Sequence, residues 1–335
     1  MFVIKSFKYL FLLSIASLLI TCSGNQKPDQ DNDEPHLRRA FRSIAHADTI
    51  TISNAPSRIT RKIRKNHQGG LIFSAFEDIM IYDGEKFTKI PHPEGYNSFD
   101  AFEDSNGNLW IASTKYGVFR YDVADFTHFT TEEGLAHDRT MDILEDDKRN
   151  VWFATMGGLS KYDGISFSSV TIGDGLPNND INTIVQDGDR QLWIGTRRSA
   201  VIYDLFTSSF TEIRTNTGET LTNVWSIIED QEGNIWLINE EGIWIQKNKR
   251  IDLISTSGGS NLFEDSKGNI WLTGSSTLSV INQESILNNS PSVTEIYSGE
   301  GMFFGVNEDA NGNIWVGTLN GVFSYDGISV KYYIN

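Results

Sequence analysis

Residues 308–315 read Glu-Asp-Ala-Asn-Gly-Asn-Ile-Trp, and five earlier stretches of the chain repeat this pattern. The same positions read Glu-Asp-Ser-Asn-Gly-Asn-Leu-Trp at 103–110 and Glu-Asp-Asp-Lys-Arg-Asn-Val-Trp at 145–152. The tryptophans that end the six stretches lie 35 to 44 residues apart: Trp110, Trp152, Trp193, Trp236, Trp271 and Trp315. A repeat of about 40 residues indicates a tandem architecture such as a propeller.

A degenerate seventh copy lies upstream. Residues 69–84 align without gaps on residues 312–327, and Ile72 then occupies the tryptophan position. Seven units of about 40 residues need about 280, and residues 58–335 supply 278. The number of repeats and the length of the chain therefore agree.

Each unit reads as four short strands, A to D. Strand A ends in Glu-Asp, as at 140–146, and the Asp-x-x-Gly-Asn that follows is typical of a tight hairpin. Examples of strands B, C and D are residues 192–196, 117–122 and 126–130. We predict an all-β fold, a single seven-bladed β-propeller of four-stranded blades. A β-sandwich is disfavoured because its strands do not repeat one turn motif at near-constant spacing.

The ring assigns roles to the repeated residues. We expect each tryptophan to pack blade against blade and each aspartate to cap its turn. Strands A and B should be apolar at nearly every residue, because neighbouring blades cover both faces of each sheet. Residues 58–66 can form strand A of the first blade and 329–334 strand D of the last. Residues 36–57 can form an extra outer strand or cross one end of the ring.

The N-terminus has the pattern of a secretory signal. Lys5 and Lys8 precede an apolar run at 10–20 that is too short to span a bilayer, which takes about 20 residues. Cys22, the chain's one cysteine, resembles the acylated cysteine of a bacterial lipobox; the alternative is an incidental residue of an ordinary signal peptide. Ser23 follows it, which by resemblance to Gram-negative sorting rules favours the outer membrane, with the body facing the periplasm or the cell surface.

The domain organisation follows from these patterns. Residues 1–22 are the lipoprotein signal peptide, 23–57 a disordered tether with an unplaced segment, and 58–335 the propeller. The chain has 28 Lys and Arg against 44 Asp and Glu, a net charge of −16. Such a surface argues against nucleic acid and anionic lipid as partners, because both need basic patches.

The pattern Asp-x-x-Gly-Asn-Leu-Trp-Ile-Gly-Thr, followed by Gly-Leu-x-x-Tyr-Asp, is similar to the two-component regulator propeller repeat. This family forms periplasmic sensor regions of hybrid two-component systems, notably in Bacteroidetes. The resemblance covers residues 66–335 and implies a seven-bladed ring that often senses oligosaccharides. Those sensors usually carry two propellers, a membrane helix and a kinase; this sequence shows no kinase motif, so we expect no phosphotransfer by it.

Binding residues are expected where the D–A and B–C loops of several blades converge at the channel mouth. Amides, carboxylates and aromatic faces there suit sugar hydroxyls and C–H surfaces. The candidates are Tyr116, His137, Asp138, Asn178, Asn179, Asp180, Arg197, Arg198, Asn223, Trp225, Glu240 and Glu241. Taken singly, each is better explained as an ordinary polar loop residue, and the prediction is made for the face as a whole.

Two enzyme classes built on propellers need weighing. Sialidases use an arginine cluster and a tyrosine nucleophile, whereas Arg197 and Arg198 are neighbours in one loop. Streptogramin-type lyases carry a histidine and a metal at one rim, where His137 is the single candidate. The six histidines are scattered and no nucleophile elbow or phosphate loop occurs, so we expect no cofactor, metal or catalysis.

The leading hypothesis is a lipid-anchored module that binds a glycan or a protein through one propeller face. One alternative is a lyase or glycosidase, which predicts three or more titratable groups at one channel mouth. The other is a protein-interaction scaffold, which predicts a large apolar patch on one face or edge.

The lipobox interpretation predicts the effect of one substitution. Cys22→Ala should release the protein from the membrane fraction, because the thiol that carries the lipid is gone. Fractionation followed by immunoblotting measures this, and Ser23→Ala serves as the matched control. Unchanged partitioning of the Cys22→Ala protein would contradict a lipid anchor at this residue.

Overall fold

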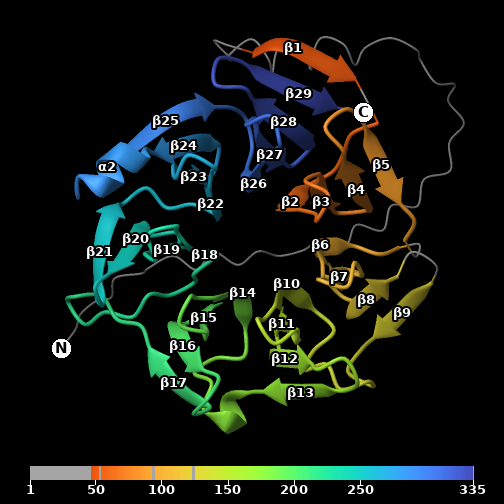
Figure 1. The fold of residues 1–335 in the computed structure, drawn as a ribbon, viewed down its shortest axis with the longest axis vertical. Coiled ribbons are helices and arrows are strands. Elements are labelled where there is room, and N and C mark those ends of the chain that lie inside the picture. The colour runs from red at the N-terminus through yellow and green to blue at the C-terminus, as the bar shows by residue number, and fades with distance from the viewer. Residues whose placement is uncertain (1–46, 53, 93–94, 123–124, 335) are drawn as a thin grey trace, which may run out of the picture. The chain divides into compact units, whose positions relative to one another are not determined.

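The computed structural model of the protein describes residues 47–52, 54–92, 95–122 and 125–334. These residues form seven sheets around a central axis, and strand A of each sheet lies innermost (Figure 1). Within each sheet, strands A to D pair in chain order and antiparallel. The predicted seven-bladed all-β propeller is confirmed.

The blades follow one another along the chain. Blade 1 comprises β2 (Thr60–Lys65), β3 (Leu71–Ala75), β4 (Asp78–Tyr82) and β5 (Phe87–Ile90). Blade 2 comprises β6 (Ser98–Glu103), β7 (Leu109–Ser113), β8 (Val118–Tyr121) and β9 (Phe126–Phe129). Blade 3 comprises β10 (Thr140–Glu145), β11 (Val151–Thr155), β12 (Gly158–Tyr162) and β13 (Phe167–Val170). Blade 4 comprises β14 (Ile181–Gln186), β15 (Gln191–Thr196), β16 (Ala200–Asp204) and β17 (Ser209–Glu212).

The remaining three blades keep this order. Blade 5 comprises β18 (Ser226–Glu229), β19 (Ile235–Ile238), β20 (Ile243–Lys247) and β21 (Arg250–Ser255). Blade 6 comprises β22 (Asn261–Glu264), β23 (Ile270–Thr273), β24 (Thr277–Ile281) and β25 (Val293–Ser298). Blade 7 comprises β26 (Phe303–Glu308), β27 (Ile314–Thr318), β28 (Gly321–Tyr325) and β29 (Val330–Ile334).

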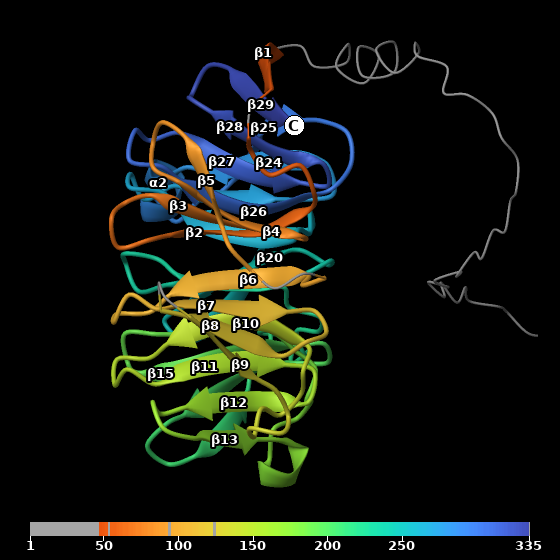
Figure 2. The same ribbon diagram turned by 90° about the vertical axis from the view of Figure 1, so that its right-hand side faces the viewer.

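Blade 7 also holds a fifth strand from the other end of the chain. Strand β1 (Ala47–Ile52) pairs in parallel with β29 at the outer edge of the blade (Figure 1; Figure 2). Of the two alternatives for residues 36–57, the extra outer strand therefore holds for 47–52. The propeller therefore includes residues that lie before its predicted boundary at residue 58.

Two short helices interrupt the strands in the described part of the chain. The 3₁₀ helix η2 (Ile172–Asp174) precedes blade 4, and α2 (Gln283–Leu287) lies in the long C–D link of blade 6. Neither has the length and hydropathy that a bilayer-crossing helix requires. Residues 1–46, including Cys22, lie outside the described residues.

The repeated tryptophans pack between blades, as predicted. Trp152 of blade 3 is buried against Leu192 and Ile194 of blade 4. Its indole Nε1 donates a 2.8 Å hydrogen bond to Asp146, whose other carboxylate oxygen accepts the backbone N–H groups of Lys148 and Asn150. The same indole–aspartate bond occurs in all six tryptophan-bearing blades.

Blade 1 reaches the same arrangement with other residues. Ile72 stands in for tryptophan and is buried against Ala101 and Leu109 of blade 2. Asn66 stands in for aspartate, and its side-chain oxygen accepts the backbone N–H groups of Gln68 and Gly70. Alignment with the last repeat identified the position of Ile72 correctly, whereas the role of Asn66 was not predicted.

A second repeated contact joins each blade to the one before it. The residue that ends strand A accepts a backbone N–H from the A–B hairpin of the preceding blade. Glu145, for example, accepts from Ser105 at 2.8 Å, and Gln186 accepts from Asp147 at 2.9 Å. Six junctions have this contact, with the acceptors Glu103, Glu145, Gln186, Glu229, Glu264 and Glu308.

The junction between blades 7 and 1 differs from the other six. Lys65 ends strand A of blade 1, and its ammonium cannot accept a hydrogen bond. There Asn307 donates its side-chain N–H to the carbonyl of Ile63 at 3.0 Å. Trp315 and Phe73 pack across the junction with ring centroids 5.5 Å apart. Apolar packing and strand β1 thus close the ring.

The expectation for strand A was wrong. Strand B is apolar and buried, but the innermost strands carry polar and charged residues, including the fully buried Asp100 and the buried Asp142. The inner edge of each blade faces the channel rather than another strand, so its free backbone groups need side-chain partners. Apolar residues alone could not satisfy them.

The interblade packing of the tryptophans makes a quantitative prediction. Trp152→Ala should lower the free energy of unfolding by about 3–5 kcal/mol, because a buried aromatic is lost and a cavity remains. Urea-induced unfolding measures this. Phe206→Ala, at a side chain 97% exposed, should change it by less than about 0.5 kcal/mol. Equal effects of the two substitutions would show that the tryptophan is not part of the interblade core.

Candidate functional site

The face of the ring that carries the B–C and D–A loops, here called the mouth face, contains a cavity of about 500 Å³. Residues at or beside the start of six inner strands line it, together with B–C loop residues of blades 5 and 6. The lining residues are Arg61, Lys62, Phe99, Asn182, Trp225, Glu240, Gly258, Gly259, Ser260, Asn261, Gly274, Ser275, Met302 and Phe304. We call it the mouth cavity.

One position of the repeat contributes most of the distinctive side chains. Four residues before the end of strand A, the seven blades carry Arg61, Phe99, Met141, Asn182, Trp225, Ser260 and Phe304. All but Met141 line the mouth cavity. The Trp and Asp positions hardly vary among blades, whereas this one holds a cation, amide, hydroxyl, thioether and aromatics. A repeated frame thus presents a non-repeating surface, as expected of a binding site.

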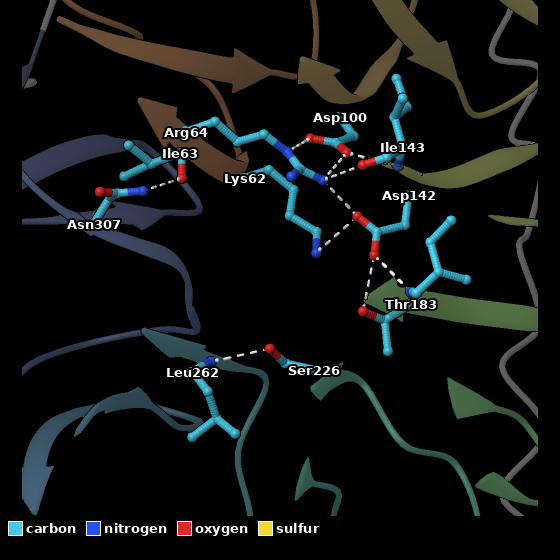
Figure 3. Close-up of polar contacts among 11 residues, drawn as sticks. Lys62, Ile63, Arg64, Asp100, Asp142, Ile143, Thr183, Ser226, Leu262 and Asn307 are labelled. Carbon is cyan, nitrogen blue, oxygen red and sulfur yellow. Dashed lines mark hydrogen bonds and ion pairs between the residues drawn. The ribbon is translucent and has the colours of Figure 1, made fainter. Parts of the chain in front are cut away.

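At the next position of the inner strands, Lys62, Asp100 and Asp142 form a charged network with Arg64 that joins blades 1, 2 and 3 (Figure 3). The guanidinium of Arg64 donates to both carboxylate oxygens of Asp100, at 2.8 and 2.5 Å, and to Asp142 at 2.7 Å. The ammonium of Lys62 lies 3.4 Å from the same Asp142. These buried charges are paired, which low-polarity surroundings require.

The two aspartates also bond to the backbone of the next blade (Figure 3). Asp100 accepts the N–H of Ile143 at 3.1 Å, and Asp142 accepts the N–H of Ile184 at 2.9 Å. Ser226 does the same for Leu262 at 3.2 Å. Each contact satisfies a backbone group on the channel-facing edge of an inner strand.

The network shifts the pKa values of its members. Burial by itself would raise the pKa of Asp142, but Lys62, Arg64 and the hydrogen bonds from Ile184 and Thr183 together hold it below its ordinary value. Burial alone would lower the pKa of Arg64, whereas Asp100 and Asp142 raise it. Asp142 and Arg64 therefore both stay ionised near neutral pH.

Arg61 is the exception among these cations. Its guanidinium lies over the rings of Phe99 and Phe304, with the central carbon 5.1 and 5.8 Å from the ring centroids. Its Nε is buried without a hydrogen-bond partner, and no acid among the described residues forms an ion pair with it. Burial lowers the pKa of Arg61, and the like charge of Arg139 lowers it further.

Two of the sequence-predicted candidates line the mouth cavity, namely Trp225 and Glu240. A third, Asn223, lies beside them: its side-chain N–H donates to Glu240 at 3.1 Å. The structure does not bring the other candidates into the cavity lining: Tyr116, His137, Asp138, Asn178, Asn179, Asp180, Arg197, Arg198 and Glu241.

Several of these other candidates stabilise their own loops. Asp138 accepts the backbone N–H of Thr131 at 2.9 Å, and Asn179 accepts that of Ile172 at 2.8 Å. Asp180 lies 3.6 Å from the exposed Arg197. These contacts hold the loops in place, and none of the four residues lines the mouth cavity.

Sequence reasoning missed the inner-strand part of the cavity, above all Arg61, Phe99, Asn182 and Phe304. We sought non-repeating residues in loops and treated strand A as core. A signal was available in the sequence, because one aligned position of strand A differs in residue type among the seven blades. A position that varies in this way has no structural role common to all blades.

The lining also bears on catalysis and on protein docking. It includes three titratable side chains, Arg61, Lys62 and Glu240. This is the number expected of an enzyme, although only one of the three is an acid. No cluster of three metal-ligating residues occurs among the residues that the structure describes.

The protein-interaction scaffold predicts a large apolar patch on one face or edge. The most exposed large apolar side chains, Ile165, Phe206 and Ile328, lie on C–D turns, away from the mouth face.

The family model described as Two component regulator propeller matches residues 175–198, which run from the D–A loop before blade 4 to its B–C loop. The predicted resemblance is thereby confirmed for this repeat. No curated protein matches the sequence closely enough to count as a relative.

Solved structures share the fold. The extracellular domain of the hybrid two component system BT3049 from B. thetaiotaomicron superposes with a TM-score of 0.69 at 20% identity, over 83% of this chain and 41% of the other. Virginiamycin B lyase from Staphylococcus aureus, solved with quinupristin, gives 0.66 at 14% identity over 81% and 96%. PorZ, a surface component of the type-IX secretion system of Porphyromonas gingivalis, gives 0.65 at 12% identity over 83% and 48%.

These similarities define the class of protein. The chain is a seven-bladed propeller that carries the two component regulator propeller repeat. It has the fold of extracellular domains of two component systems and spans about two fifths of the first such structure.

The Asp142 network predicts a dependence of stability on pH. Because the folded protein lowers the pKa of Asp142, its contribution is present above the ordinary value of about 3.9 and is lost as pH falls through the lower folded value. Asp142→Asn should cost about 3 kcal/mol at neutral pH, since Lys62 loses its partner and Arg64 loses one of its two.

Denaturant unfolding between about pH 7 and pH 2 measures both effects. Asp142→Asn should flatten the fall in stability below about pH 4. Asp252→Asn, at a half-exposed side chain on β21, should keep the wild-type profile. A steep acid limb that persists unchanged in Asp142→Asn would contradict the assignment.

Proposed function

We propose that this protein is a lipid-anchored binding module that takes a ligand, an oligosaccharide in the first instance, into the mouth cavity. One observation carries the proposal: six of the seven blades contribute the residue at one strand position, of five types in all, to one cavity of about 500 Å³. That volume is within the range of small-ligand sites.

The chemistry of the lining suits a sugar. Trp225 and Phe99 offer apolar faces for the C–H surfaces of a pyranose ring. Asn182, Asn261 and Glu240 offer donors and acceptors for hydroxyl groups. An apolar wall with a few convergent polar groups is the usual composition of a small-ligand site.

The frame beneath the cavity favours a preformed site. The bonds of Asp100, Asp142 and Ser226 to adjoining blades fix the inner strands relative to one another. A site on rigid elements loses little conformational entropy when it binds. Propellers of similar fold have been solved with ligands, quinupristin on virginiamycin B lyase and a peptide on YCF48.

The anchor and location belong to the same proposal. Acylation at Cys22 would hold the ring at the outer membrane, and the similar domains of two component systems are extracellular. In this role the propeller would bind its ligand outside the cytoplasm without its own kinase. A partner protein would then relay or use the bound ligand.

A glycan and peptide array probed with the full chain, followed by calorimetry on the hits, tests the proposal. Trp225→Ala should weaken binding of a carbohydrate hit by about tenfold or more, because an aromatic stacking surface is lost. Tyr116→Ala, an exposed aromatic of the mouth face outside the cavity lining, should leave the affinity unchanged. Absence of any array hit, or equal effects of the two variants, would overturn the proposal.

The second candidate is a lyase or glycosidase that uses the same cavity. Glu240, with Arg61 and Lys62 in the same lining, is the observation that favours it. Turnover of an array hit that is abolished by Glu240→Gln, with binding retained, would decide for the enzyme.

A further inference from the structure

Among the residues that the structure describes, Arg61 is a cation without a counter-ion in the wall of the mouth cavity. The neighbouring cations of blade 1 are paired: Lys62 with Asp142, and Arg64 with Asp100 and Asp142. Its guanidinium lies over the rings of Phe99 and Phe304, and its Nε is buried and has no hydrogen-bond partner among the described residues.

Such an arrangement lowers stability unless something compensates for it. A guanidinium taken out of water needs hydrogen-bond acceptors, and aromatic faces supply only part of the lost solvation. Burial and the like charge of Arg139 both lower the pKa of Arg61, which reports the same lack of an anion. Groups kept at a cost to stability are characteristic of functional sites.

The cavity is also polarised across the ring. Arg61 and Lys62 lie on blade 1, whereas the carboxylate of Glu240 lies on the B–C loop of blade 5. Glu240 has a partner within the protein, because Asn223 donates to it at 3.1 Å. The unsatisfied charge in the cavity is therefore positive, although the whole chain has a net charge of −16.

We propose that the mouth cavity binds an anionic oligosaccharide whose acidic group pairs with the guanidinium of Arg61. This inference rests on the proposed binding function and names the ligand class. A guanidinium flanked by two rings has a fixed plane and presents its donors to a carboxylate or sulfate as a fork. The sugar ring would lie toward Trp225, with its hydroxyl groups near Asn182 and Glu240.

Two kinds of sugar carry such a group, uronic acids and sulfated sugars. The probes are a galacturonate trisaccharide, its fully methyl-esterified form, a κ-carrageenan disaccharide, and neutral galactobiose. Calorimetry with the full chain should show binding of at least one anionic probe, roughly 10- to 100-fold tighter than its neutral counterpart, as for a hydrogen-bonded ion pair. The probe that binds identifies the source of the charge.

Arg61→Met keeps a flexible apolar side chain between Phe99 and Phe304 and removes the charge. It should abolish the preference for the anionic probe and, because an unpaired and partly buried charge is gone, melt at or above the wild-type temperature. Arg58→Met is the matched control: Arg58 is exposed, lies 3.1 Å from Glu77 and does not line the cavity. It should bind as the wild type does.

The outcomes separate this inference from the proposed function. Equal affinities for anionic and neutral probes, with both weakened by Trp225→Ala, would overturn the role of Arg61 and leave the binding function intact. No binding of any probe would overturn the anionic-ligand inference, while array hits of another class would still support the binding function. An anionic preference that persists in Arg61→Met would also overturn the inference.

Discussion

The structure depends on one recurring interaction, in which a side chain of one blade accepts a backbone N–H from an adjacent blade. Near the axis, Asp100, Asp142 and Ser226 accept from the inner strand of the next blade. At the opposite end of strand A, residues such as Glu145 accept from the hairpin of the preceding blade. A four-stranded sheet leaves its inner edge unpaired, and these contacts satisfy that edge while fixing the angle between blades.

The same interaction explains how the ring closes. At six junctions a Glu or Gln at the end of strand A accepts the hydrogen bond. At the seventh junction this position is Lys65, which cannot accept one. There the chain uses the packing of Trp315 on Phe73, the Asn307 bond and the parallel strand β1. The two ends of the folded chain thus meet in one blade, as Figure 1 shows, so that unfolding either end exposes this junction.

Much of the frame could be predicted from the sequence because its residues recur. The Trp and Asp positions, the number of blades and the substitution of Ile72 all follow from aligning the repeats. Strand β1 could be offered only as one of two alternatives, since its segment lies outside the repeat. The Arg64 network could not be predicted, because its partners Asp100 and Asp142 lie on other blades, 36 and 78 residues away.

The candidate site, too, could be predicted from the sequence only in part. The mouth face was predicted from the way propeller loops converge, and Trp225 and Glu240 do line its cavity. Arg61 and Phe99 were missed because they belong to strands. From sequence alone, an aromatic residue in a strand is interpreted as part of the core and a polar one as part of a strand edge. Only their place in the ring shows that such residues from six blades share one space.

We propose that this rigid frame holds the ligand in the mouth cavity. Hydrogen exchange measured by mass spectrometry, on the full chain alone and with the saccharide that binds in calorimetry, tests this most directly. Bound ligand should slow backbone amide exchange at 223–226, 258–261 and 302–305. Exchange in the A–B hairpins of the opposite face, at 146–150 and 187–191, should not change. Unchanged exchange around the cavity, or protection confined to those hairpins, would contradict it.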